Sequence, residues 1–148
     1  MNNDHNRIQS VRAGAPYVLD LLFQDGLSAR VDLRDTLARY RSLRTLLDGS
    51  LFMTAHVGEQ GASVAWGEGG LLELAADNLR ALAFEQQGHA SNQSLIEWMA
   101  RHKLTLDAAA QALGVSRRML AYYRSGEKPL PRTVALACLG WEVERRAA

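Results

Sequence analysis

The stretch TLDAAAQALGVSRRMLAYYRSG, from Thr105 to Gly126, constrains the fold of this chain most, because its capping residues divide it into two short helices. Thr105 suits the N-cap of the first helix, since its hydroxyl accepts a hydrogen bond from a backbone N–H that lacks an intrahelical partner. Gly114 suits the end of that helix, because a residue without Cβ enters the left-handed region at little cost. Ser116 then caps a second helix, which Gly126 ends. The sequence therefore predicts two helices joined by a tight turn.

The side chains of this helix pair separate into an inward set and an outward set. Helical periodicity groups the inward residues, which are Ala109, Ala110, Leu113, Leu120 and Tyr123. The outward residues are Arg117, Arg118, Ala121, Tyr122 and Arg124. A small residue where the two helices cross and a glycine at the corner are typical of a helix-turn-helix motif. Two adjacent arginines oppose the helix dipole at this helix start, so we interpret them as contacts for an anion or a guanine edge. The alternative is a solvated charged face.

A family resemblance rests on these residues and on the segment that follows them. Ala110, Gly114, Val115, Ser116, Leu120 and SGEKPLP at residues 125–131 resemble the phage-repressor (Cro/cI, or XRE) class of helix-turn-helix DNA-binding domains. The likeness covers about residues 95–141 and implies an all-α, lambda-repressor-like fold. It also implies a transcriptional regulator that binds double-stranded DNA. Because one such helix seldom gives enough affinity alone, we expect a homodimer. The candidate DNA-binding residues are Ser116, Arg117, Arg118, Tyr122, Arg124 and Lys128, and weaker candidates for phosphate contacts are Lys103 and Arg132.

Charge is distributed unevenly along the chain, although the formal net charge is only +1. Residues 1–90 hold 8 arginines against 11 acidic residues, a balance of −3, and residues 91–148 hold 9 basic against 5 acidic residues, a balance of +4. A phosphate-binding module joined to a more acidic domain shows this asymmetry. A chance division of solvated charges is the alternative.

The first half of the chain reads as a small α+β domain. Alternating apolar residues predict strands over 8–13, 17–23 and 27–32, with a hairpin turn at Asp25-Gly26. Residues 33–47 take a helical spacing, with an expected apolar stripe of Leu37, Tyr40, Leu43, Leu46 and Leu47 that Asp48-Gly49 closes. Residues 53–57 and 62–66 predict a second strand pair, and residues 67–70 a loop. Residues 71–74 form a segment that leads to Asp77, the expected N-cap of a helix to about Gln86. We expect one antiparallel sheet covered by helices.

This half also resembles a known group. The order of FQDGLSARVDL (residues 23–33), LFMTAHV (51–57), ASVAWGEG (62–69) and LAADNLR (74–80) is similar to a bacterial domain family of unknown function that is often fused to repressor-like modules. Its short members lack a helix-turn-helix, which implies an alternative function: a protein-interaction or antitoxin-like module that acts through the N-terminal domain. The predicted domains are residues 1–88 and 89–148, with a Gly-, Ser- and Asn-rich linker over 86–94.

The predicted C-terminal domain begins and ends with further helices. Ser94 or Asn92 is the expected cap of a helix over 95–102, with Leu95, Ile96 and Met99 on its buried edge. Pro131 suits the first position of a last helix through about Trp141, with Val134, Leu136 and Ala137 in the core.

No constellation of residues predicts chemistry. The histidines are scattered, and turn or capping duty explains each member of the Asp25, Asp32 and Asp35 cluster. Cys138 lies among Ala and Leu residues, which indicates a buried structural thiol. We therefore expect no catalytic residue, no cofactor and no metal, and packing roles for Trp66 and Trp98. No signal peptide or membrane-spanning run is recognised, so a cytoplasmic protein is expected.

Overall fold

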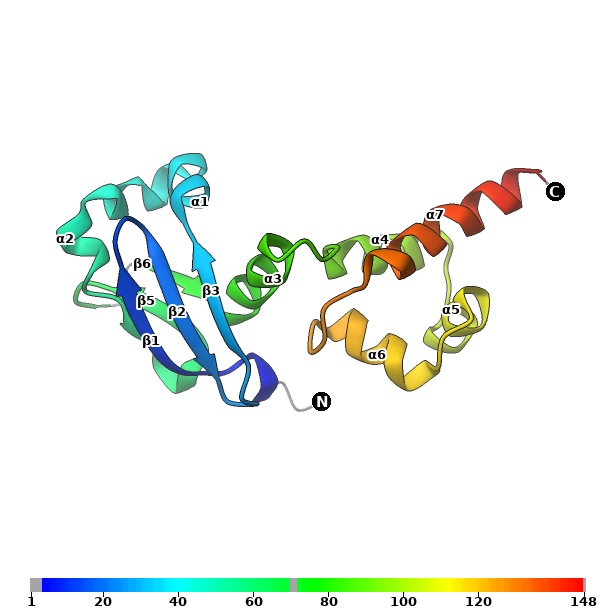
Figure 1. Ribbon diagram of the computed structural model, residues 1–148, viewed down its shortest axis with the longest axis horizontal. Helices are drawn as coiled ribbons and strands as arrows, with labels where there is room; N and C mark the ends of the chain where they lie inside the picture. The colour runs from blue at the N-terminus through cyan, green and yellow to red at the C-terminus, as the bar shows by residue number, and fades with distance from the viewer. Residues whose placement is uncertain (1–3, 70–71, 148) are drawn as a thin grey trace. The chain divides into compact units, whose positions relative to one another are not determined.

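The computed structural model describes residues 4–69 and 72–147, and Figure 1 shows their order. The chain divides into two compact units, Met1–Ala83 and Phe84–Ala148. The sequence placed the boundary five residues later, after residue 88. Phe84, near the end of a helix, lies edge-on to His89 at 6.2 Å between ring centroids, and both residues belong to the second unit. Residues 70 and 71 lie outside the described residues. They belong to the expected 67–70 loop and the expected 71–74 segment.

The first sheet of the N-terminal unit is antiparallel in the order β1-β2-β3. Its strands are β1 (Ile8–Gly14), β2 (Val18–Phe23) and β3 (Ser28–Asp32), as the alternation predicted. Leu19, Leu21 and Phe23 of β2 face the core, and the residues between them face outwards and are only half-buried. The turn between β2 and β3 contains Gly26 at a φ of 94°, which favours glycine.

The segment after β3, whose helical spacing allowed one helix or two short ones, folds into three short helices. They are α1 (Arg34–Arg39), a 3-10 helix over Arg41–Leu47, and α2 (Gly49–Phe52). Leu37, Leu43 and Leu46 are buried as expected, but Tyr40 and Leu47 are exposed, because the break at Tyr40 interrupts the α-helical periodicity. Asp48 ends the 3-10 helix as its C-cap, as predicted, and its carboxylate also accepts a hydrogen bond from the Ser50 N–H and caps α2.

A second antiparallel sheet completes the N-terminal core, in the order β4-β5-β6. The expected strand pair is present as β4 (His56–Val57) and β5 (Ser63–Trp66), and the first of these is shorter than predicted. The sequence interpretation missed β6 (Leu72–Ala75), which it took for a connecting segment before Asp77. Trp66 has the packing role that was expected: it is buried and its indole N–H donates to the Phe52 carbonyl at 2.9 Å.

The helix α3 (Ala76–Gln86) carries a buried arginine that the sequence interpretation overlooked. Arg80 donates to both carboxylate oxygens of Asp25, at 3.2 and 2.7 Å, and to the His5 carbonyl at 2.8 Å. Its Cζ lies 5.0 Å from the ring centroid of Phe23. Arg80 thus ties α3 to the β2–β3 turn and to the start of the chain. Asp77, the predicted N-cap, lies instead in the first turn of α3, since Ala76 is already helical.

The C-terminal unit is all-helical, apart from an isolated bridge between Ala90 and Leu130. Its helices are α4 (Asn92–Arg101), α5 (Leu106–Leu113), α6 (Arg117–Ser125) and α7 (Arg132–Ala147). Leu95, Ala109, Leu120 and Leu130 lie at the centre of its core.

Three expectations for this unit are corrected by the structure. The cap of α4 is Ser91, not Ser94 or Asn92, because the chain turns at Gly88 and pairs at Ala90 before the helix begins. On α4 the buried residue beside Leu95 and Met99 is Trp98, and Ile96 is 36% exposed. Helix α7 runs six residues beyond Trp141, and Leu136 lies on its outer face, 52% exposed.

The first and last helices of this unit are joined by polar and aromatic contacts. The Glu142 carboxylate accepts hydrogen bonds from Arg101 and from His102, the latter at 2.8 Å. The hydrogen bond with His102 and the charge of Arg101 lower the pKa of Glu142 below its ordinary value, against the opposing effect of burial. Trp98 packs edge-on against Trp141 at 5.2 Å between ring centroids, so Trp98 has the packing role that was predicted.

Candidate functional site

The helix pair around Gly114 is formed by the capping residues that the sequence predicted. The Thr105 hydroxyl accepts from the Ala108 N–H at 3.1 Å and caps α5. Gly114 ends α5 in the left-handed conformation, with φ of 71°. The Val115 N–H then donates to the Ala110 carbonyl at 3.1 Å, which fixes the turn before α6 begins. Three residues, Gly114 to Ser116, therefore separate the two helices.

Helix α6 is anchored at both ends and along one face. The Ser116 hydroxyl accepts from the Met119 N–H at 3.1 Å, and Gly126 ends the helix at a φ of 81°. Leu120 is fully buried and Tyr123 packs against the same core, as the periodicity predicted. Because this face is fixed, the opposite face of α6 is held towards solvent.

Arg117, at the start of α6, has an acidic neighbour that the sequence interpretation did not foresee. Its Nε lies 3.1 Å from the Asp107 Oδ1 in the first turn of α5. The side chains are 67% and 75% exposed, so water competes for both charges. Exposed pairs of this kind contribute little to stability. The guanidinium can therefore exchange Asp107 for another anion at small cost.

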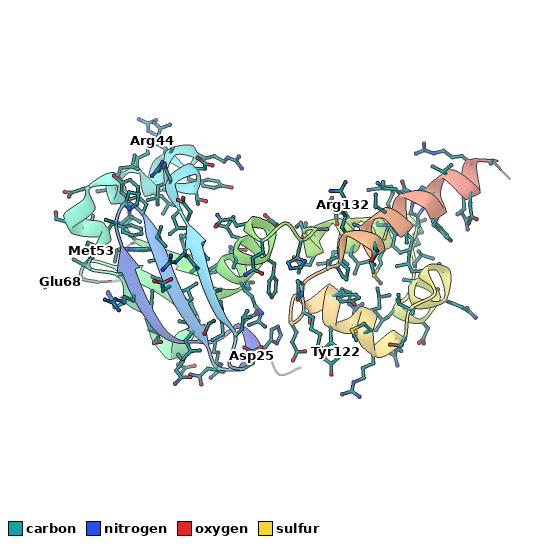
Figure 2. The ribbon with its side chains drawn as sticks, viewed as in Figure 1. Asp25, Arg44, Met53, Glu68, Tyr122 and Arg132 are labelled. Atoms are coloured by element: carbon teal, nitrogen blue, oxygen red, sulfur yellow. The ribbon has the colours of Figure 1, made fainter. Side chains whose placement is uncertain are left out.

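Arg118 and Tyr122 of α6 form a cluster with Lys128, which follows the helix. The Arg118 Nε donates to the Tyr122 hydroxyl at 3.1 Å, and its Cζ lies 5.7 Å from the centroid of that ring. Lys128 Nζ lies 4.6 Å from the same centroid, and its backbone N–H donates to the Tyr122 carbonyl. Figure 2 shows Tyr122 projecting from α6. The hydrogen bond with Tyr122 raises the pKa of Arg118 further above its ordinary value, so its charge is permanent.

The other sequence candidates differ in position and exposure. Ser116 is exposed, but its hydroxyl oxygen is engaged as the N-cap. Arg124 is half-buried in the last turn of α6, where its carbonyl accepts from the Asn92 side chain at 3.4 Å. Lys103 is exposed at a φ of 53°, just before α5, and Arg132 is exposed at the start of α7 (Figure 2). Within α6 itself the charged residues are three arginines and no acid.

Sequence reasoning missed the aromatic contact of Lys128 and the pairing of Arg117 with Asp107. The first lies beyond the left-handed residue Gly126, which reverses the chain towards Tyr122. The second joins the first turns of two different helices, so helical spacing alone does not show it.

Other side chains considered for chemistry are buried or bonded to neighbouring groups of the fold. Burial raises the pKa of the Cys138 thiol to about 11, with a further contribution from Glu142, so the thiol is neutral at physiological pH. The Asp25 carboxylate pairs with Arg80, and Asp32 accepts from the Arg34 N–H at 2.9 Å. Within residues 4–69 and 72–147, no group of three or more His, Cys, Asp or Glu side chains could hold a metal ion. The helices of the described residues include none long and apolar enough to cross a membrane.

Comparison with solved structures connects nearly the whole chain to another protein. The crystal structure of "putative DNA binding protein NE0471" from Nitrosomonas europaea ATCC 19718 superposes with a TM-score of 0.81 at 41% sequence identity, and the match covers 94% of this chain and 88% of that chain. This chain belongs to the same family. Because nearly the whole chain is matched, the family combines an N-terminal α+β unit with the helical unit that carries α5 and α6. No protein-family model matches the chain, and no curated protein does.

Proposed function

We propose that this protein is a sequence-specific DNA-binding protein that regulates transcription, with α5 and α6 acting as a helix-turn-helix of the phage-repressor type. Helix α6 would lie in the major groove, which is wide enough to admit an α-helix. The Nitrosomonas relative, described as a DNA-binding protein, supports this class of function. The proposal assigns no reaction, cofactor or metal to the protein.

One observation carries the proposal: α6 presents Arg118 and Tyr122 on the face opposite its buried Leu120, and Arg117 is exposed at the start of the same helix. Arginine binds the O6 and N7 atoms of guanine in a two-pronged geometry, and an aromatic ring meets a thymine methyl group or base edge. Arg117 and Arg118 would therefore read guanine or grip phosphate, and Tyr122 would contact an adjacent base. Because the Arg117–Asp107 ion pair is exposed, replacing Asp107 by DNA phosphate or a base costs little.

The surrounding residues suit the phosphate backbone. The N–H groups at the start of α6 and the Ser116 position form a helix N-terminus, which favours anions. Arg124, in the last turn of the same helix, and Lys128, two residues beyond Gly126, would add phosphate contacts. Phosphate contacts position a protein on DNA without reading its sequence.

A single such helix gives limited affinity, so we also propose that the protein binds as a homodimer. Two-fold related copies of α6 would enter successive major grooves about 34 Å apart, or a multiple of that spacing. The bound sequence would then be a palindrome, because the symmetry of the protein is mirrored in its site.

The experiment is selection of bound sequences from random duplex DNA, followed by fluorescence anisotropy on the recovered site at several salt concentrations. Arg118→Ala should weaken binding roughly tenfold or more and relax the preference at one base pair. Lys128→Ala should weaken binding to all sequences alike and reduce the salt slope by about one. Arg30→Ala, an exposed arginine of the N-terminal unit, is the matched control and should change nothing. Unchanged affinity and preference in Arg118→Ala would contradict the proposed reading helix.

The second candidate is a protein-interaction or antitoxin-like module that acts through the N-terminal unit. The observation behind it is an open groove on the outer face of the first sheet, where Arg12, Leu22 and Arg30 lie among its lining residues. Co-purification of a second protein, lost on substitution of Leu22, together with undetectable DNA affinity at low salt, would favour this candidate over the first. Both functions are compatible in a module that represses its own gene.

A further inference from the structure

The outer face of α7 carries an apolar stripe that the helical core does not use. Leu136, Leu139 and Val143 are 52%, 59% and 63% exposed. They recur at spacings of three and four residues, so they lie on one side of the helix. Val134 and Cys138 of the opposite side are buried in the C-terminal core. Of the seven large hydrophobic residues exposed among residues 4–69 and 72–147, three lie on this one helix face.

Gly140 lies within the same stripe, and no contact within the chain requires a glycine at this position. A Cβ built at this position meets no atom within 4 Å, and the residue is exposed. A glycine inside an exposed helix costs about 1 kcal/mol relative to alanine. The absence of a side chain leaves room for a second helix to approach the backbone of α7 between Leu139 and Val143.

The two flanks of the stripe carry charges of opposite sign, so they can pair with the flanks of a second copy. At about 100° per residue, Glu144 lies on one flank of the stripe and Arg146 on the other. Both are exposed, and neither has an ion-pair partner in the described part of the chain. A two-fold rotation that sets two copies of α7 side by side in parallel brings Glu144 next to the partner's Arg146, and the reverse. This points to a second copy of this chain as the occupant.

We propose that the face of α7 formed by Leu136, Leu139, Gly140 and Val143, here called the α7 stripe, is a self-association surface. Two copies of α7 pack in parallel along it, with the leucine and valine side chains in the seam and two Glu144–Arg146 pairs at its edges. This surface would join the two subunits of the homodimer in the proposed function, on which the inference rests, and its association does not require DNA. Three apolar side chains and a glycine make a small interface, well under the roughly 800 Å² per partner of a standard one. Self-association is therefore weak, with a Kd on the order of 10 µM.

Sedimentation equilibrium of the full chain without DNA, from low to several hundred micromolar, tests the surface. Leu139→Glu should raise the dimer Kd at least about tenfold, because a charge replaces an apolar contact in the seam. Met53→Glu is the matched control: Met53 is 54% exposed in the N-terminal unit, and its variant should associate like the wild type. Circular dichroism would verify that both variants are folded.

Charge exchange tests the identity and direction of the partner. Glu144→Arg alone and Arg146→Glu alone should each weaken association about threefold or more, and the double exchange should restore it. A wild type that stays monomeric throughout the concentration range overturns the proposal, as does association that Leu139→Glu leaves intact. Failure of the double exchange to restore association overturns the parallel packing. Arg118→Ala, which tests DNA recognition, should leave self-association unchanged, so that failure of either proposal is seen separately.

Discussion

Replacing Arg80 by methionine is expected to destabilise the N-terminal unit far more than the same replacement at Arg30. Both arginines pair with an aspartate at nearly the same distance, 2.7 Å from Arg80 to Asp25 and 2.8 Å from Arg30 to Asp20. Their exposure differs: the Arg80 side chain is 3% exposed and that of Arg30 is 75% exposed. Burial is thus the main variable in this comparison.

The magnitude follows from what Arg80 leaves behind. Removing one partner of a buried ion pair costs about 3–5 kcal/mol, because the other charge is left uncompensated. The Asp25 side chain is 29% exposed, so we expect a loss at the lower end of this range, about 3 kcal/mol. The His5 carbonyl and the Phe23 ring lose their contacts as well. At Arg30 water replaces the lost partner, and no measurable change is expected.

Urea unfolding followed by fluorescence measures this difference. Trp66 is the tryptophan of the N-terminal unit, and Trp98 and Trp141 belong to the other unit. Replacing the latter two by phenylalanine leaves Trp66 as the sole probe of the N-terminal core. With a slope near 1.5 kcal/mol per molar, Arg80→Met should lower the midpoint by about 2 M.

The pH dependence provides a second check with a fixed sign. Burial acts to raise the pKa of Asp25, but hydrogen bonds from Arg80 and the Leu27 N–H outweigh it, and the pKa is lowered. A lowered pKa in the folded state gives stability that is present above the unfolded value and is lost as the pH falls through the folded value. The gap between wild type and Arg80→Met should therefore be full at pH 7 and shrink below about pH 4. Equal midpoint shifts for Arg80→Met and Arg30→Met, or a gap that does not depend on pH, would refute the reasoning.

Three further predictions concern the C-terminal unit. Gly126→Ala should lower its stability by about 1–2 kcal/mol in thermal unfolding, because the φ of 81° is strained for alanine and the new Cβ would lie 3.1 Å from Asn92 Nδ2; an unchanged melting temperature would argue against this cap. Cys138 should resist thiol reagents at pH 7 and react at its ordinary rate in denaturant, since its pKa is about 11 when folded; rapid labelling of the native protein would contradict the burial. Tyr122→Phe should reduce DNA affinity less than Tyr122→Ala, because phenylalanine keeps the ring beside Lys128 while losing the hydroxyl bound by Arg118; equal losses would assign the whole effect to the hydroxyl.

Local signals determined several elements of this fold before any tertiary contact is considered. The caps at Thr105, Gly114 and Ser116 act through backbone groups a few residues away, so the sequence contains their whole cause. The alternation in β2 and β3 likewise predicted which side chains face the core. The exposed direction of Arg118 follows from helical periodicity, since Leu120 fixes the buried face of the helix, and Arg117 is exposed because it stands at the helix start.

Contacts between distant segments decided the rest. Asp25 was read as a turn residue, and only the packing of α3 against the hairpin brings Arg80 to it across 55 positions in sequence. The pairing of Arg117 with Asp107 depends on how α5 and α6 cross, which no spacing within either helix encodes. On α7, periodicity places Leu136 and Val134 equally well in a core, and the tertiary structure assigned Val134 to the inside and Leu136 to the outside. Local caps and alternation are short-range properties of the backbone, whereas burial and ion pairing require the whole folded chain.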